Sequence, residues 1–199
     1  MKASKRSWRR GCCGTGLAAL LVMGGPSGAA DAPPAGAASQ RTAQEHSPHG
    51  VGCTGFRYDL GRELKLFAGR PEQLVAGPAD AAAPAATERL YEVRLQPQEG
   101  FKFAVAPDKA TVADGSYAGV LRVQPRQGGV LRVTINEQAW LDVVVDGVLM
   151  TSRDHTGSAN CELLHKSVEF PITAGKPLLV QISGSTVPTV KLTLTQPPT

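Results

Sequence analysis

VLRVTINEQAWLDVVVDGVLMTS, residues 130–152, is the stretch that decides the fold of this chain. In the runs 130–135 and 140–146, apolar side chains recur at every second position, which places them on one face of an extended strand. Asp146-Gly147 separates the second run from further apolar residues, and this dipeptide in that setting indicates a tight hairpin. The stretch therefore predicts antiparallel strands with one face in a core. The residues predicted to form that core, with two from the C-terminal region, are Leu131, Val133, Ile135, Leu141, Val143, Val145, Leu192 and Leu194.

The same alternation recurs along most of the chain. About eight or nine short strands separated by turn residues predict an all-β fold, an antiparallel β-sandwich of the jelly-roll-like kind. One short helix is expected within 56–69, where Asp59 can cap it and Leu60, Leu64 and Phe67 recur at helical spacing. The segment 75–88 is expected to be a loop. The other predicted strands are 90–95, 101–105, 117–123, 148–152, 163–170, 178–183 and 190–195.

The N-terminus has the order of a secretory signal peptide. A basic head precedes an apolar stretch at 16–25 and small residues at 26–32. The apolar stretch is shorter than the roughly 18 to 20 residues of a membrane helix, so no transmembrane segment is expected after cleavage. We predict a Sec-type rather than a twin-arginine signal, cleavage after Ala29 or Ala30, and a periplasmic or secreted protein. The basic head is formed by Lys2, Lys5, Arg6, Arg9 and Arg10.

The chain is expected to have three parts. Residues 1–29 are the predicted signal peptide, and residues 30–52, rich in Ala, Pro, Gly and Ser, are a predicted disordered tether. Residues 53–199 are long enough for one β-sandwich domain with its own core. The whole chain has 21 Lys and Arg against 17 Asp and Glu, but five of the basic residues lie in the signal. The exported protein would therefore be close to neutral, which argues against nucleic acid or an anionic membrane as a partner.

Two cysteines, Cys53 and Cys161, remain after export. In an oxidising compartment such a pair usually forms a disulfide, although two free thiols are the alternative. Closing a loop of about 110 residues stabilises a protein by roughly 4 to 5 kcal/mol in the chain-entropy model. The predicted bridge would join the start of the domain to the loop before a late strand.

The four histidines lie near these two cysteines, and this suggests a candidate metal site. If the disulfide forms, His155, Glu162 and His165 could bind one transition-metal ion, iron or zinc, with His46 or His49 as a further ligand. The alternative is an ordinary strand over 163–170. In that alternative one face carries Leu164, Val168 and Phe170, and the other carries His165, Ser167 and Glu169.

Trp140 is the candidate for ligand contact. On the alternating pattern it points away from Leu141, so it is either an exposed aromatic beside Asp142 or a cover for a second core face. An exposed aromatic of this kind suits sugar stacking or docking of a partner. We predict Trp140, Asp142 and Arg153 as ligand-binding residues. The sequence contains no nucleophile elbow, phosphate loop or His-Glu-x-x-His helix.

GVLRVTINEQAWLDVVVDG (129–147), HKSVEFPITAGKPLLVQISGS (165–185) and VKLTLT (190–195) resemble a group of small exported bacterial proteins of unknown function. The last two stretches also resemble the end of jelly-roll modules attached to secreted peptidases and glycosidases. Some members of the exported group carry a homogentisate dioxygenase label. That label implies an iron held by two histidines and a glutamate, for which only His155, Glu162 and His165 could stand in.

From the sequence we expect an exported, non-enzymatic β-sandwich protein without a cofactor. It would bind a ligand, a glycan or a small molecule, or a partner protein in the cell envelope. The first alternative is a metal-dependent enzyme, such as a non-haem iron dioxygenase, that uses the histidine cluster. The second is a structural envelope protein.

Overall fold

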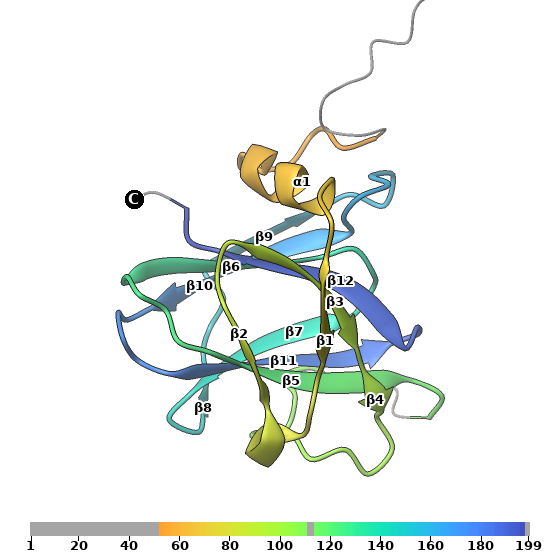
Figure 1. Ribbon diagram of the computed structural model, residues 1–199, viewed down its shortest axis with the longest axis vertical. Coiled ribbons are helices and arrows are strands. Elements are labelled where there is room, and N and C mark those ends of the chain that lie inside the picture. Colours follow the sequence, from red (N-terminus) through yellow and green to blue (C-terminus); the bar gives the residue numbers. More distant parts are fainter. Residues whose placement is uncertain (1–51, 111–113, 198–199) are drawn as a thin grey trace, which may run out of the picture. The chain divides into compact units, whose positions relative to one another are not determined.

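The computed structural model describes residues 52–110 and 114–197, and these form two packed β-sheets and one short helix (Figure 1). The predicted signal peptide and His46 and His49 lie outside the described residues, as does nearly all of the predicted tether. The helix is α1 (Gly61–Phe67), and a 3₁₀ turn, η1, spans Ala79–Ala81. Sheet A contains, in spatial order, β1 (Glu72–Val75), β3 (Arg89–Arg94), β12 (Thr189–Thr195), β6 (Gly129–Ile135), β10 (Lys166–Ile172) and β9 (Asp154–Gly157). Sheet B contains β2 (Ala83–Ala85), β5 (Tyr117–Val123), β11 (Leu178–Ser185), β7 (Trp140–Val145) and β8 (Val148–Leu149), with β4 (Gln96–Pro97) paired to β5.

Eight of these strands form a jelly roll. When β3, β5, β6, β7, β8, β10, β11 and β12 are numbered one to eight along the chain, sheet A has the order 1-8-3-6 and sheet B the order 2-7-4-5. Every pairing among these eight strands is antiparallel. This double Greek-key arrangement confirms the predicted all-β, jelly-roll-like sandwich.

Four further strands were not expected, and two of them make both sheets mixed. β1 runs parallel to β3, and β2 runs parallel to β5, so the segment 75–88 is not simply a loop. β4 and β9 also add short antiparallel pairings at the sheet margins. Such short edge strands pair through backbone N–H and C=O groups, which every residue except proline has. They need no alternation of apolar side chains, so the sequence pattern does not reveal them.

The predicted strand 101–105 is wrong. Instead of joining a ladder, this segment covers the outer face of sheet B, where the side-chain carboxamide of Gln181 takes the place of a strand partner. Its Oε1 accepts hydrogen bonds from Ala104 N (2.8 Å) and Val105 N (3.3 Å), and its Nε2 donates to Val105 O (3.0 Å). A buried backbone N–H or C=O group needs a hydrogen-bond partner, and a side chain can serve in place of a neighbouring strand.

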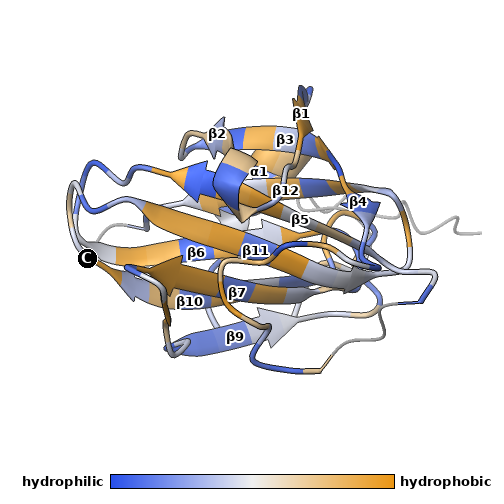
Figure 2. Cartoon of the chain, turned by 90° about the horizontal axis from the view of Figure 1, so that it is seen from below, coloured by the Kyte–Doolittle hydropathy of each residue, from blue (hydrophilic) through white to orange (hydrophobic). Residues whose placement is uncertain are grey.

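The core lies between the inner faces of the two sheets, and it confirms the predicted apolar sets. Leu131, Val133 and Ile135 are fully buried there beside buried residues of β7, β10, β11 and β12, while Val145 packs against this core and is partly buried. Figure 2 shows this apolar content along β6, β7, β10 and β11. The predicted hairpin is also present, since β7 and β8 are joined at Asp146 and Gly147, whose φ angles are 50° and 74°. Two successive positive φ values are what a tight hairpin turn with the right-handed strand twist requires.

A second apolar cluster holds α1 against the outer face of sheet A, on the side away from sheet B (Figure 1). Asp59 Oδ1 accepts the Gly61 N–H (2.8 Å), in agreement with its predicted capping role. Leu164 belongs to this cluster and not to the face of Val168 and Phe170, because β10 begins only at Lys166. The predicted common face for these three residues is therefore wrong. The buried members of the cluster are Cys53, Leu60, Leu64, Phe67, Leu90 and Leu164.

A buried ionic network lies beneath α1. Arg132 Nε and Nη2 donate to Glu169 Oε1 (3.0 and 2.8 Å), and Arg132 Nη1 donates to Glu63 Oε1 (3.1 Å). The Thr195 hydroxyl donates to the same Glu63 oxygen, and the guanidinium lies 4.5 Å from the ring centroid of Tyr58. Burial lowers the pKa of Arg132, but the hydrogen bonds and charges of Glu169 and Glu63 outweigh that effect and raise it above its ordinary value. The network therefore joins α1 to β6, β10 and β12 through charged groups.

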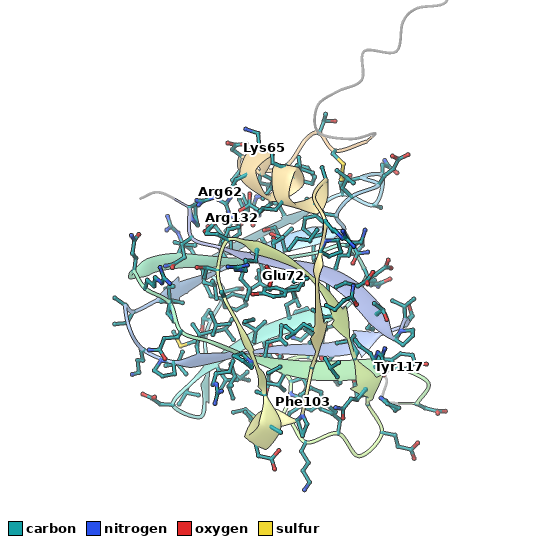
Figure 3. All side chains as sticks on the ribbon, viewed as in Figure 1. Arg62, Lys65, Glu72, Phe103, Tyr117 and Arg132 are labelled. Carbon is teal, nitrogen blue, oxygen red and sulfur yellow. A yellow bond between two sulfur atoms is a disulfide. The ribbon has the colours of Figure 1, made fainter. Side chains whose placement is uncertain are left out.

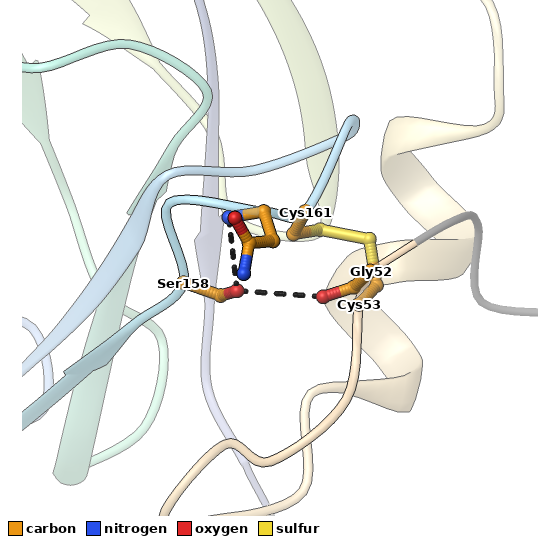
Figure 4. The surroundings of a disulfide bond; sticks show 5 residues. Gly52, Cys53, Ser158 and Cys161 are labelled. Atoms are coloured by element: carbon orange, nitrogen blue, oxygen red, sulfur yellow. Dashed lines mark hydrogen bonds between the residues drawn. A yellow bond between two sulfur atoms is a disulfide. The ribbon is translucent and has the colours of Figure 1, made fainter.

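The predicted disulfide between Cys53 and Cys161 is present, and it joins residues 108 positions apart. Figure 4 shows hydrogen bonds beside it: the Ser158 hydroxyl donates to Gly52 O (3.4 Å) and accepts the Asn160 N–H (3.3 Å). The bridge thus ties the segment before α1 to the loop between β9 and β10. Disulfides of this kind are typical of oxidising compartments.

Candidate functional site

A cavity of about 420 Å³ opens at one edge of the sandwich and is lined by residues of both sheets, and we call it the edge pocket. Its volume lies in the range of about 300 to 1,000 Å³ that is common for small-molecule sites. It has two aromatic side chains, several aliphatic ones and a few charged ones. The lining residues are Asp108, Trp140, Leu141, Asp142, Leu149, Met150, Thr151, Ser152, His155, Lys166, Val168 and Phe170.

The pocket exists because β8 is too short to cover the edge of β7. β8 pairs with Val144 and Val145, and the Met150 N–H donates to Val143 O (2.8 Å), after which the chain leaves sheet B and crosses to β9 in sheet A. The beginning of β7, at Trp140, therefore has no strand beside it on this edge. Residues 150–152 of the crossing segment and the start of β10, at Lys166, both line the pocket.

Trp140 is held by polar contacts and is half-buried. Its Nε1 donates to Asp142 Oδ1 (2.9 Å), which lies two residues further along the same face of β7. The ammonium groups of Lys109 and Lys166 each lie 5.4 Å from the centroid of the indole ring. Cations at this distance are attracted to the ring's electron-rich face. The indole is thus oriented by Asp142 and accompanied by two cations.

Burial shifts the pKa values of Asp142 and Lys166, which lie near the indole. The pKa of Asp142 is raised, first by burial and opposed by hydrogen bonds from the backbone N–H of Asp108 (3.3 Å) and from Trp140. The pKa of Lys166 is lowered, first by burial and then by the charge of Lys109, while the charge of Asp142 opposes the shift. In both residues the pocket disfavours the charged form.

The pKa of Lys166 should respond in opposite directions to two neighbouring substitutions. Asp142→Asn should lower it further because a stabilising negative charge is lost, and Lys109→Gln should raise it because a repelling positive charge is lost. Following the Lys166 side-chain resonances by NMR as a function of pH measures both shifts. The pKa of Lys166 is higher in the unfolded protein than in the folded protein. The free energy of unfolding should therefore rise as the pH increases through the folded-state pKa. Lys166→Met should abolish that rise, and two shifts of the same sign would contradict this account.

The pocket brings together only some of the predicted site residues. Trp140 and Asp142 line it, but Arg153 is exposed outside it, and its backbone N–H donates to Glu169 O (2.7 Å). Of the candidate metal ligands, His155 lines the pocket, whereas Glu162 and His165 do not. In the part of the chain that the structure describes, no three His, Cys, Asp or Glu side chains are grouped so that they could hold a metal ion. The predicted metal triad is therefore not assembled.

Four contributors to the site were not singled out from the sequence. Asp108 and Lys109 belong to the segment after 101–105, which reaches Trp140 only because it folds over sheet B. Met150 lies in the crossing segment, and Lys166 approaches the indole from the other sheet. The predicted strand 163–170 placed Lys166 within a strand, whereas β10 begins at this residue.

Fold and site together define an all-β jelly-roll protein with a pocket of ligand size at its open edge. No family model, curated protein or solved structure matches this chain. Within the described residues, no helix has the length and hydropathy needed to cross a bilayer.

Proposed function

We propose that this protein is an exported binding protein, and that the edge pocket holds a small ligand, one saccharide unit in size, against Trp140. The observation that carries the proposal is the convergence of an indole, Lys166 and Asp142 on a cavity of about 420 Å³. Binding pockets typically combine apolar and aromatic walls with a few fixed polar groups, and this pocket has that composition.

The chemistry of the walls favours a saccharide. An indole suits the C–H surface of a sugar ring, while Asp142 at its Nε1 edge and Lys166 near the ring suit the sugar's hydroxyls. The Lys166 ammonium can donate hydrogen bonds, and His155 adds a second polar group on the same side of the pocket. No catalytic step is needed for this role.

Export of the protein is supported by two independent features. The basic, apolar and small-residue order of the first 29 residues is typical of a secretory signal. The Cys53–Cys161 disulfide is compatible with an oxidising, extracellular compartment. A metal-dependent enzyme is not favoured, since the candidate ligands His155, Glu162 and His165 are not grouped as a metal site.

Trp140→Ala should weaken saccharide binding about tenfold, because the loss of an aromatic face costs roughly 1.5 kcal/mol. The chain has two tryptophans, Trp8 and Trp140. Trp8 lies in the predicted signal peptide, so in the protein without residues 1–29 the fluorescence of Trp140 reports directly on the pocket. We would titrate this protein with a panel of neutral hexoses and hexuronic acids, and measure the Trp140→Ala variant by calorimetry.

Phe103→Ala is the matched control, since Phe103 is a half-buried aromatic outside the pocket whose ring lies 4.9 Å from that of Phe101. This variant should bind as the parent protein does. Binding that survives Trp140→Ala, or a panel in which no saccharide binds, would show the proposal to be wrong.

A further inference from the structure

A second and larger concavity lies beside α1, away from the edge pocket, and we call it the basic groove. It has a volume of about 1,200 Å³ and is bounded by α1, by the connection from β2 to β3, and by the connection from β5 to β6. Figure 3 labels two of its side chains on α1, Arg62 and Lys65, and one on β1, Glu72.

The groove carries an excess of positive charge. Five cationic side chains line it: Arg62, Lys65, Arg70, Arg89 and Arg126. Only two carboxylates accompany them, and both are already paired, Glu88 with Arg62 (2.7 Å) and Glu72 with Arg89.

Three cations remain without a carboxylate partner among the residues described. Lys65 comes from α1, Arg70 from the turn after it, and Arg126 from the connection between β5 and β6, and all three are exposed. Cations gathered in a concave surface produce a stronger positive potential than the same charges spread over the molecule. The near-neutral net charge expected for the exported chain argues against nucleic acid or an anionic membrane as a partner, but it does not exclude a local group of cations such as this one.

We propose that the basic groove binds a linear acidic polysaccharide, a chain of carboxylate-bearing sugars. The groove is too large for a single small anion, and its open form suits an extended chain. Alongside the cations, the carboxamide side chains of Gln124, Gln127 and Gln196 line it, and these are suitable partners for sugar hydroxyls.

The lining argues against single-stranded nucleic acid. Proteins that bind such strands present aromatic rings on which bases stack. Tyr91 is the only aromatic residue lining the groove; it is buried, and its hydroxyl accepts the Ala86 N–H (2.9 Å). No ring is therefore available as a stacking platform.

The groove is separate from the edge pocket. The connection that carries Arg126 enters β6 at Gly129, while the other end of β6, at Ile135, pairs with Lys166 of the pocket. Six residue steps along a strand span about 20 Å. Occupancy of the two sites can therefore be measured independently.

The test uses the full chain and oligosaccharides of polygalacturonate, a linear acidic polysaccharide. Lys65→Gln/Arg70→Gln/Arg126→Gln should bind these oligosaccharides about tenfold more weakly, since each exposed ion pair contributes roughly a factor of two to three. The control variant is Arg94→Gln/Lys102→Gln/Arg153→Gln, which removes three exposed cations outside the groove. It has the same net charge as the test variant and should bind as the parent does. Binding of the parent should also weaken steeply as salt is added.

Three outcomes would overturn the proposal. The first is equal binding by the parent and the groove variant, and the second is an equal loss in both triple variants, which would mean that only net charge matters. The third is tighter binding of single-stranded DNA or of a poly-glutamate peptide than of the oligosaccharide. Trp140→Ala should leave this binding unchanged, so a failure here is distinct from a failure at the edge pocket.

Discussion

Replacing Arg132 with methionine is expected to lower the free energy of unfolding by about 3 to 5 kcal/mol, the cost of leaving buried charges without a partner. The guanidinium makes hydrogen bonds to Glu169 and Glu63, and it also donates to Asp59 O (2.9 Å). Glu63 is completely buried, and its second oxygen, Oε2, has no hydrogen-bond partner among the residues described. Without Arg132, two carboxylates would face each other in an environment that excludes water. Denaturant unfolding measures the loss.

A compensating variant separates this mechanism from simple loss of packing. When Glu63 and Glu169 are also replaced with methionine, no uncompensated charge remains, and most of the lost stability should return. If the triple variant is as unstable as Arg132→Met alone, packing and not charge accounts for the effect. Arg89→Met is a matched control, since its ion pair with Glu72 is exposed and should contribute about 1 kcal/mol or less.

Removing the disulfide is expected to cost a similar amount, about 4 to 5 kcal/mol in the chain-entropy model for a closed loop of 108 residues. The variant is Cys53→Ala/Cys161→Ala, and its unfolding midpoint should fall in the same way as that of the parent protein treated with a reductant. The eight jelly-roll strands should persist, since their ladders and their core do not include these cysteines. Reductant should not change the unfolding midpoint of the alanine variant. If the alanine variant unfolds at the same midpoint as the untreated parent protein, the prediction is wrong.

The two losses should not add. The disulfide and the Arg132 network hold the same segment, residues 53–67, against sheet A, so that once one of them is gone the other has less left to stabilise. A double-mutant cycle should show a combined loss that is smaller than the sum by about 1 to 3 kcal/mol. Because Arg62 and Lys65 project from this segment, binding to the basic groove should weaken in the same variants, whereas binding in the edge pocket should not.

The jelly roll could be predicted from the sequence because strand patterning is local. A period of two in apolar residues depends only on the pleat of a strand, so runs such as 130–135 and 140–146 identify their own inward faces. Asp146-Gly147 likewise predicts a turn locally, because this dipeptide readily adopts the positive φ angles that a tight hairpin requires. The Cys53–Cys161 bridge could be predicted from cysteine number alone, given an oxidising compartment.

The sites depended on residues that the fold brings together from distant positions. Trp140 and Asp142 could be identified as a pair because they lie two residues apart on one strand, but their cationic neighbours Lys109 and Lys166 come from a covering segment and from the other sheet. The apolar alternation of the segment 101–105 predicts a strand. In the structure, however, its backbone groups form hydrogen bonds with the side chain of Gln181 and not with a neighbouring strand. Local patterns do not say which of several possible partners a backbone group will have.

By itself, then, the sequence determined the two-sheet architecture, its core residues, its hairpin and its disulfide, all of which follow from local periodicity or from residue counts. Only the tertiary structure decided where charge gathers. The chain beyond its first 29 residues is nearly neutral, but Lys65, Arg70 and Arg126 meet in one groove, and Arg132 meets Glu63 and Glu169 beneath α1. Electrostatic interactions depend on distance in space, which net charge and spacing along the chain do not contain.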